Sequence, residues 1–403
     1  MLTAIIIAFF IGILFGIICG LAPGIHTNLI SVFIISSLAF LLSYFSPLSV
    51  VTFIVAMSIT QVFIDFIPST YLGAPDEDTV LSILPSHKLL LEGFGHSAIV
   101  YSIYGCIIGL LLVLLFSFPL IVFLNNFYSV FQFFMPFILI IISLFIILNI
   151  ENNRLLAVIV FILSGFLGIV SLNQNISNSL LPLLTGLFGS SSLILSIARK
   201  EKIPEQKIQA FNEIKPSKKE FLRTIIASSL ASPLCSFLPG LGSSQAAIIG
   251  SQSIKKITEK EFLILIGSIN IIVMGLSFVT LYAIGKMRTG SAAAISQIIS
   301  NLSTSDLFII LLMIILSGII SIFLTFFFSK VFAKNINKIN YKCLSISILI
   351  FLTGIIFYFT GFVGILIYLT STFLGIYTIS KNLPRHILMG CLLIPTTLMY
   401  VFP

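Results

Sequence analysis

The chain has 403 residues, of which 58% are hydrophobic and 8% are charged, and its formal net charge is +8 at pH 7. Soluble domains carry roughly 25% charged residues, so this composition excludes a soluble globular protein and predicts a polytopic membrane protein. Of the 21 basic residues, only Lys88 and Arg154 lie within residues 1–198. Basic residues that cluster in short loops are typical of membrane-orientation signals and do not indicate a nucleic-acid surface.

Cysteine and histidine spacings argue against metal or disulfide chemistry. The five cysteines lie in apolar segments without paired spacing, and the four histidines show no HExxH or similar pattern. We therefore expect no metal site and no catalytic residues, because no nucleophile–base pair or carboxylate dyad is evident either. The N-terminus lacks a basic region and a small-residue cleavage site, which predicts that there is no removable signal peptide.

The first apolar run is interrupted at residues 21–28, which include Pro23, Gly24 and His26. The apolar stretches 2–19 and 29–42 on either side are each long enough for a helix. Proline and glycine end helices, and a break inside hydrocarbon leaves peptide groups that lipid cannot satisfy. We expect a broken helical hairpin whose second helix begins at Thr27 and Asn28.

The remainder of the first half contains one span, one irregular segment and then four spans. The span covers 49–66, after a turn at Ser46 and Pro47, and Asp65 lies near its end. Residues 67–97 are polar and rich in turns, with two short amphipathic pieces, and form either a re-entrant segment or a cytoplasmic loop. The four spans are predicted at about 98–124, 127–148, 155–171 and 179–198. Residues 199–223 carry charges of both signs, which is typical of a solvated linker.

The second half repeats this order. A helix at 224–237 leads to a second break, which contains Pro239 and Gly240 and is followed by Ser243, Ser244 and Gln245. Next come one span at 262–284 and a polar segment at 286–300. Four further spans are predicted at about 305–328, 343–360, 362–380 and 387–402.

The two halves, 1–198 and 224–403, therefore each contain five full spans, and an odd number predicts opposite orientations. If each hairpin enters and leaves on the same side, the basic loops at 151–154, 199–223, 255–261, 329–342 and 381–385 all lie in the cytoplasm. If the hairpins instead cross fully, 199–223 and 329–342 fall on opposite sides. The apolar spans predict an all-α protein of the plasma membrane. The loop charges favour an arrangement of two inverted-topology repeats.

The two matched breaks are the candidate substrate site. Helix N-termini carry partial positive charge and unpaired N–H groups, and paired interruptions in two halves of a transporter point to its binding site. Kinks of this kind can also serve packing alone. The candidate substrate-binding residues at the breaks are Pro23, Gly24, Thr27, Asn28, Pro239, Gly240, Ser243, Ser244 and Gln245.

Further candidates lie away from the breaks. Asn270 is mid-span, where an unpaired amide is costly, so it either bonds another helix or contacts substrate. Lys286 and Arg288 form either a snorkelling anchor pair or a cationic site for an anion. His26 and Asp65 are ion-coupling candidates, although an interfacial helix cap is an alternative role for Asp65.

At these motifs the chain resembles TctA, the large permease subunit of the tripartite tricarboxylate transporters, in a short form like those of archaea. The resemblance rests on residues 20–24, on Ala74-Pro75 with 84–88 and 92–93, and on 238–242 followed by 260–262 and 268–270. The chain departs from the family at Ile271, where a second Asn is expected, at Asp76, where Gly is expected, and near residues 285–286, where Pro-Gly is expected.

The resemblance implies cation-coupled uptake of a small organic anion, with Na⁺ or H⁺ as the coupling ion and no other cofactor. It also implies a small membrane subunit and an extracytoplasmic binding protein as partners. A translocase for a polyprenyl phosphate or another lipid phosphate remains the alternative, because two hairpins with hydroxyl side chains would suit a phosphate headgroup. A channel is disfavoured, since no ring of charge is present.

Overall fold

Helices make up the regular structure throughout the described part of the chain. The computed structural model describes residues 2–22, 27–73, 81–148, 150, 153–174, 179–198, 204–237, 243–254, 257–336 and 341–402. The predicted tips of both breaks, with Pro23, Gly24, His26, Pro239 and Gly240, lie outside these residues.

The first half begins with α1 and α2, which flank the first break. Its elements are α1 (Leu2–Leu21), α2 (Thr27–Ser36), α3 (Leu38–Tyr44), α4 (Pro47–Ile64), α5 (Phe66–Tyr71), α6 (Ile83–Leu91), α7 (Gly95–Leu148), α8 (Arg154–Leu172), α9 (Leu180–Leu184), the π-helix η1 (Thr185–Ser190) and α10 (Ser191–Ala198). The helix start predicted at Thr27 is confirmed. The two short pieces predicted within 67–97 correspond to the end of α5 and to α6.

The second half likewise begins with two helices that flank a break. Its elements are α11 (Lys218–Phe237), α12 (Ser243–Gln252), α13 (Glu259–Ile284), α14 (Gly290–Ile298), α15 (Thr304–Asn335), α16 (Tyr341–Ser380), the 3₁₀ helix η3 (Arg385–Met389) and α17 (Gly390–Val401). The turn predicted at residues 360–361 is confirmed, because Gly361 interrupts α16 with φ 63° and ψ −156°, a backbone conformation that favours glycine.

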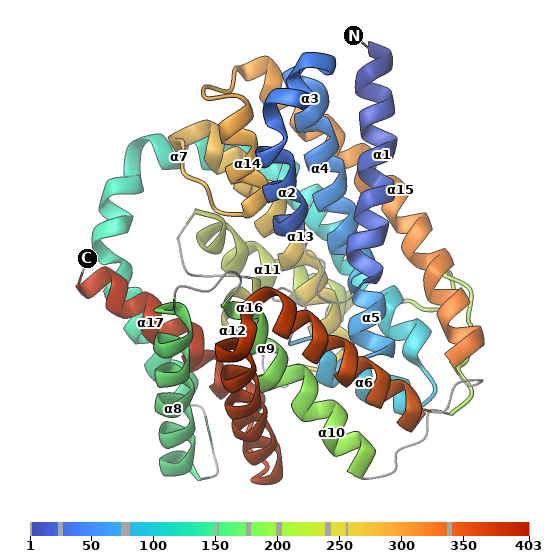
Figure 1. Cartoon of the computed structure of the whole chain (residues 1–403), viewed down its shortest axis with the longest axis vertical. Coiled ribbons are helices and arrows are strands. Elements are labelled where there is room, and N and C mark those ends of the chain that lie inside the picture. Colours follow the sequence, from blue (N-terminus) through green and yellow to red (C-terminus); the bar gives the residue numbers. More distant parts are fainter. Residues whose placement is uncertain are drawn as a thin grey trace.

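The predicted separation of spans 98–124 and 127–148 is wrong, because α7 runs through Asn125 and Asn126 without a break. The amide of Asn126 donates to the carbonyl of Val122, 2.7 Å away, so this polar side chain is satisfied within the helix. At about 1.5 Å per residue, the 54 residues of α7 have a path length of roughly 80 Å, more than twice the hydrocarbon thickness of a bilayer, so the uninterrupted helix is still long enough for the two predicted crossings. Figure 1 shows α7 changing direction at the upper left.

The helix before each break packs through a stripe of small residues. Gly12, Gly16 and Gly20 of α1 lie against α4, where a Cβ on Gly16 would come within 2.6 Å of the Met57 carbonyl oxygen. In α11, Ser228, Ser232 and Ser236 are fully buried, each 216 residues after one of these glycines. Their hydroxyls donate to carbonyls of their own helix, so the three serines act as small packing residues.

The long contact between α7 and α13 lies at the centre of the protein. A Cβ on Gly105 would lie 2.0 Å from the carbonyl oxygen of Ile264, and one on Gly109 would lie 2.7 Å from that of Ser268. On the opposite side of the contact, Gly267 of α13 faces the Ser102 carbonyl. These glycines allow the two backbones to approach each other closely.

We predict that Gly105→Ala destabilises the protein, because the added methyl group would press on backbone that cannot rotate away. Overpacking of this kind costs about 1–3 kcal/mol. Thermal unfolding in detergent should detect a lower midpoint for this variant. Gly354→Ala is the matched control, since a Cβ on Gly354 meets nothing within 4 Å. Equal midpoints for the two variants would contradict the close contact.

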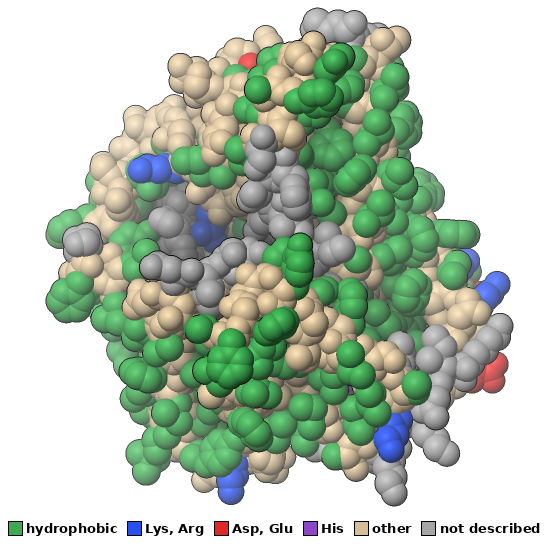
Figure 2. All heavy atoms as spheres, viewed as in Figure 1, with side chains coloured by type: hydrophobic (Ala, Val, Ile, Leu, Met, Phe, Trp, Pro, Cys, Tyr) green, Lys and Arg blue, Asp and Glu red, His purple; other side chains and the backbone are tan. Residues whose placement is uncertain are grey.

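The protein is a multi-pass membrane protein. In the described residues, seven helices are long and apolar enough to cross a membrane, and two shorter apolar segments, Leu180–Leu195 and Arg385–Val401, add to these. Apolar side chains cover much of the face seen in Figure 2. Figure 1 places the N-terminus, α3 and α14 at one end of the molecule and α6 and the end of α10 toward the other.

Candidate functional site

The helix start after the first break is held in place by a buried glutamine. The backbone N–H of Thr27, at the start of α2, donates to Oε1 of Gln61 at 3.1 Å. Both residues are buried, and Gln61 lies on α4. One of the N–H groups that a helix start leaves without an intrahelical partner is therefore satisfied by a side chain from a neighbouring helix. Asn28 is also in the first turn of α2, but the structure does not describe its side chain.

The second break is connected to α13. Thr280 donates its hydroxyl to the carbonyl of Ser236 in the last turn of α11, at 3.3 Å. After the break, Ser243 and Ser244 begin α12 and are both buried. The hydroxyl of Ser243 has no hydrogen-bond partner among the described residues, so it is available to a ligand. The structure does not describe the side chain of Gln245.

The short helix α14 lies between these two regions. Thr289 caps it by accepting a hydrogen bond from the N–H of Ala292 at 3.2 Å, within the polar segment predicted at 286–300. The Ser291 hydroxyl lies 2.6 Å from that of Ser58 on α4, and the Thr289 hydroxyl lies 3.2 Å from that of Ser277 on α13. Helix α14 also packs against α2.

Together these contacts form a polar path from one break to the other. Ser58 and Gln61 are three residues apart on α4 and therefore share a helix face, as do Ser277 and Thr280 on α13. The path runs from Thr27 through α4, α14 and α13 to Ser236, at the end of α11. The structure thus links the start of the helix after the first break to the end of the helix before the second break.

Asn270 lies on α13 two turns before Ser277, and both are fully or almost fully buried. A spacing of seven residues places the two on the same helix face. Asn270 is therefore aligned with the polar path, and the structure places it close to the centre of a span where its amide is shielded from water.

Lys286 and Arg288 differ in their surroundings. Lys286 is exposed, while Arg288 is half-buried and directly precedes the cap residue Thr289. Arg288 lies near Cys235, in the last turn of α11, and near Tyr400 on α17. Figure 2 shows a hollow with a basic side chain inside it, in the region bordered by α7, α14 and α17 in the matching view of Figure 1. The pair is thus divided into a surface lysine and an arginine that faces the second hairpin.

Asp65 is buried between α4 and α5, one helical turn after Gln61. Its side chain makes no capping bond to α5, which disfavours the interfacial-cap interpretation. The hydroxyl of Ser69 donates to the backbone carbonyl of Asp65 at 2.8 Å. Asp65 therefore places a carboxyl group on the same face of α4 as the residue that holds the first helix start.

Gln61 was not among the residues predicted from the sequence. An amide in mid-span must bond another helix or contact a ligand, and this holds for Gln61 as it does for Asn270. Among the described residues, no group of three or more His, Cys, Asp or Glu side chains could hold a metal ion.

Comparison with known proteins identifies the family. Residues 6–390 match the family model described as the tripartite tricarboxylate transporter TctA family. The chain is also similar to an uncharacterized protein of Methanocaldococcus jannaschii, with 33% identity over 402 residues that cover 97% of this chain and 98% of the relative. No solved structure matches the chain. Because the family model spans nearly the whole sequence, the chain belongs to the TctA family of membrane transporters.

Proposed function

We propose that the protein is a secondary transporter that moves a small organic anion, such as a di- or tricarboxylate, across the plasma membrane. The helix starts at Thr27 and at Ser243 and Ser244 supply N–H groups and hydroxyls to one shared anion site. Arg288 supplies a positive charge beside α14, and Asn270 completes the polar wall. Pro23, Gly24, Pro239 and Gly240 open the two helices so that their ends can meet the anion.

One observation carries this proposal. Four buried or part-buried hydrogen bonds, aligned along α4, α14 and α13, lead from the start of α2 to the end of α11, and Arg288 directly precedes the cap of α14. Buried polar groups of this kind are costly unless they are satisfied, so membrane proteins concentrate them at substrate and ion pathways. The family assignment supplies the class, a membrane transporter.

We further propose that the two halves are inverted repeats around this site, with residues 199–223 as a cytoplasmic linker. Corresponding elements support this, since α1 packs against α4 as α11 packs against α13. The small-residue stripes of α1 and α11 support it too, because they are offset by the same 216 residues as Gly24 and Gly240. Alternating access would then move the two hairpins relative to the rest of the bundle.

Transport is proposed to be coupled to Na⁺ or H⁺. Asp65 is the coupling candidate with the strongest support, because it is a buried carboxyl one turn from Gln61. His26 remains a second candidate on sequence grounds. Since the family name describes a tripartite system, we also propose a small membrane subunit and an extracytoplasmic binding protein as partners.

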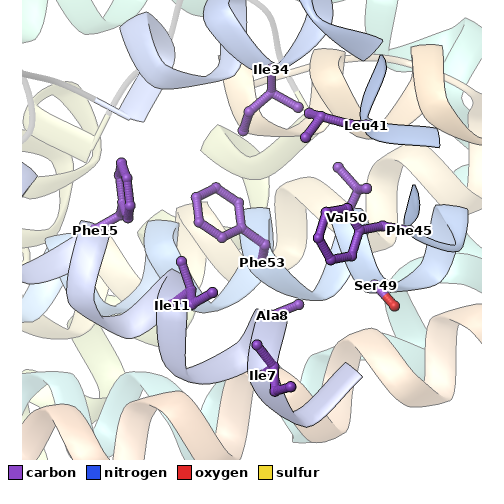
Figure 3. Close-up of a pocket in the computed structure, with 10 residues that line it drawn as sticks. All are labelled: Ile7, Ala8, Ile11, Phe15, Ile34, Leu41, Phe45, Ser49, Val50 and Phe53. Carbon is purple, nitrogen blue, oxygen red and sulfur yellow. The ribbon is translucent and has the colours of Figure 1, made fainter. Parts of the chain in front are cut away.

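A lipid-phosphate translocase is the second candidate, favoured by an apolar cavity within the first hairpin. The cavity measures about 220 Å³ and lies between α1, α2, α3 and α4. Phe15, Phe53 and Ile34 line it, and two further lining residues, Ile7 and Ile11, are exposed on the surface of the protein (Figure 3). Such a cavity would accept part of a prenyl chain.

Uptake into proteoliposomes tests the two functions against each other. We expect accumulation of at least one labelled di- or tricarboxylate, and we expect it to increase when an inward Na⁺ or H⁺ gradient is imposed. The same vesicles should show no accelerated flipping of a prenyl phosphate. Flipping without uptake of any acid would overturn the organic-anion proposal.

Lys286 is exposed and Arg288 is half-buried, so we predict that substitutions at the two positions have different effects on transport. Arg288→Gln should raise the KM for the transported acid roughly tenfold, since a hydrogen bond to a charged group contributes about 1.5–3 kcal/mol. Lys286→Gln should change it by less than about twofold, because exposed charges interact weakly. Initial uptake rates at varied acid concentration measure both. Equal effects of the two variants would remove Arg288 from the site.

A further inference from the structure

A second cavity lies away from the breaks, at the junction of three segments. It measures about 580 Å³ and is bordered by α6, by the region from α12 to the start of α13, and by the turn before η3. Its lining residues are Leu81, Pro85, Lys88, Ile248, Ser251, Ile257, Thr258, Glu259, Phe262, Ile379, Asn382, Leu383, Pro384, Arg385 and His386. The loop charges predict that two of these segments, at 255–261 and 381–385, lie on the cytoplasmic side.

Arg385 is the central group of this cavity wall. Its guanidinium donates to the carbonyl of Phe188 at 3.3 Å and to the hydroxyls of Ser191 and Ser192 at 3.4 and 2.6 Å. All three partners are neutral, and Nε of Arg385 has no partner among the described residues. A largely enclosed guanidinium whose hydrogen-bond partners are all neutral is unfavourable, and an anion in the cavity would relieve the cost.

The other charges of the cavity leave that positive charge uncompensated. Lys88 forms an ion pair with Glu259, which joins α6 to the start of α13. The hydrogen bond to Glu259 raises the pKa of Lys88, so the lysine is charged at neutral pH. Because these two charges cancel, the charge of Arg385 remains, and His386 lines the same cavity.

We propose that this cavity is a second anion-binding site, in which Arg385 binds the carboxylate of a small organic acid. The Nε–H of Arg385, which has no partner among the described residues, can donate a charge-assisted hydrogen bond to such a carboxylate. The site deepens the proposed function, on which this inference rests, by giving the transported acid a binding position toward the cytoplasm. Binding itself does not require that the protein transports anything.

A single tryptophan tests the site, because the natural chain contains none. Phe262→Trp places one in the cavity wall, and Phe118→Trp, on a side chain 74% exposed, is the matched control. Titration of the purified, full-length protein with succinate, citrate and inorganic phosphate should change the fluorescence of the first variant saturably. The control should not respond.

Charge variants in the Phe262→Trp background decide whether Arg385 is responsible. Arg385→Lys should weaken binding roughly tenfold, since it removes the Nε–H donor while it keeps the charge. Glu259→Gln should strengthen binding, by about threefold or more, because it removes the competing carboxylate and frees Lys88. Glu259 is on the surface, so this variant remains informative even if Arg385→Lys disturbs the contact with Ser192.

The outcomes separate this inference from the proposed function. A saturable response without uptake in proteoliposomes would leave the cavity site intact and overturn organic-anion transport. Uptake without any fluorescence response, or affinities unchanged in both charge variants, would overturn the cavity site. A response to phosphate alone would also overturn it, since the proposal is for a carboxylate.

Discussion

Replacing Gln61 with leucine should abolish uptake while the protein still inserts into the membrane. The N–H of Thr27 would lose its acceptor, and an unsatisfied buried donor costs about 1–3 kcal/mol. The start of α2 would then shift from its position beside α4 and α14. We expect the initial rate of acid uptake to fall roughly tenfold or more, given that about 1.4 kcal/mol corresponds to a factor of ten.

Two companion variants show whether the acceptor is what matters. Gln61→Glu keeps an oxygen within reach of Thr27 and should therefore retain more uptake than Gln61→Leu. Gln297→Leu, at an exposed position on α14, should leave uptake unchanged. If Gln61→Leu transports within about twofold of the unmodified protein, Gln61 does not position the first helix start.

Asp65→Asn should uncouple transport from the cation gradient. The substitution keeps the size and hydrogen-bonding groups of the side chain but removes the charge that a cation would require. Gradient-driven accumulation should be lost, while exchange of labelled for unlabelled acid across vesicles at equal cation concentration should continue. Measuring both modes in the same vesicles separates a coupling defect from a folding defect.

Asp306→Asn is the matched control for this prediction. Asp306 accepts a hydrogen bond from the N–H of Ser303 as part of a helix cap at the start of α15, away from the polar path. The Asp306→Asn variant should keep both gradient-driven accumulation and exchange. Gradient stimulation that survives in Asp65→Asn would leave His26 as the coupling candidate.

The sequence was sufficient to predict the broken helices and the residues that restart them. Proline and glycine end a helix through local sterics, so the starts at Thr27, at Ser243 and at Gly290, after the Thr289 cap, and the break at Gly361, follow from nearby residues. The error at residues 125–126 has the same origin. Two asparagines looked like a separator, although Asn126 can satisfy its amide within its own helix.

The arrangement of the candidate site depends on contacts that are distant in sequence. Ser58 meets Ser291 across 233 residues, and nothing local to either serine indicates this pairing. The role of Gln61 was accessible in part, because an amide in mid-span requires a partner, but its partner is a backbone group at Thr27. The cavity at Arg385 combines segments from both halves and was not expected from any one of them.

The central proposal is that both helix starts line one anion site, and cysteine labelling tests it most directly. Thr27→Cys and Ser243→Cys are made separately in a Cys343→Ser background, because Cys343 is exposed while the other four cysteines are buried. Maleimide labelling is then measured against rising concentrations of the transported acid. We predict that the same acid protects both cysteines with the same half-maximal concentration. Protection of one cysteine only, or of neither, would contradict a shared site.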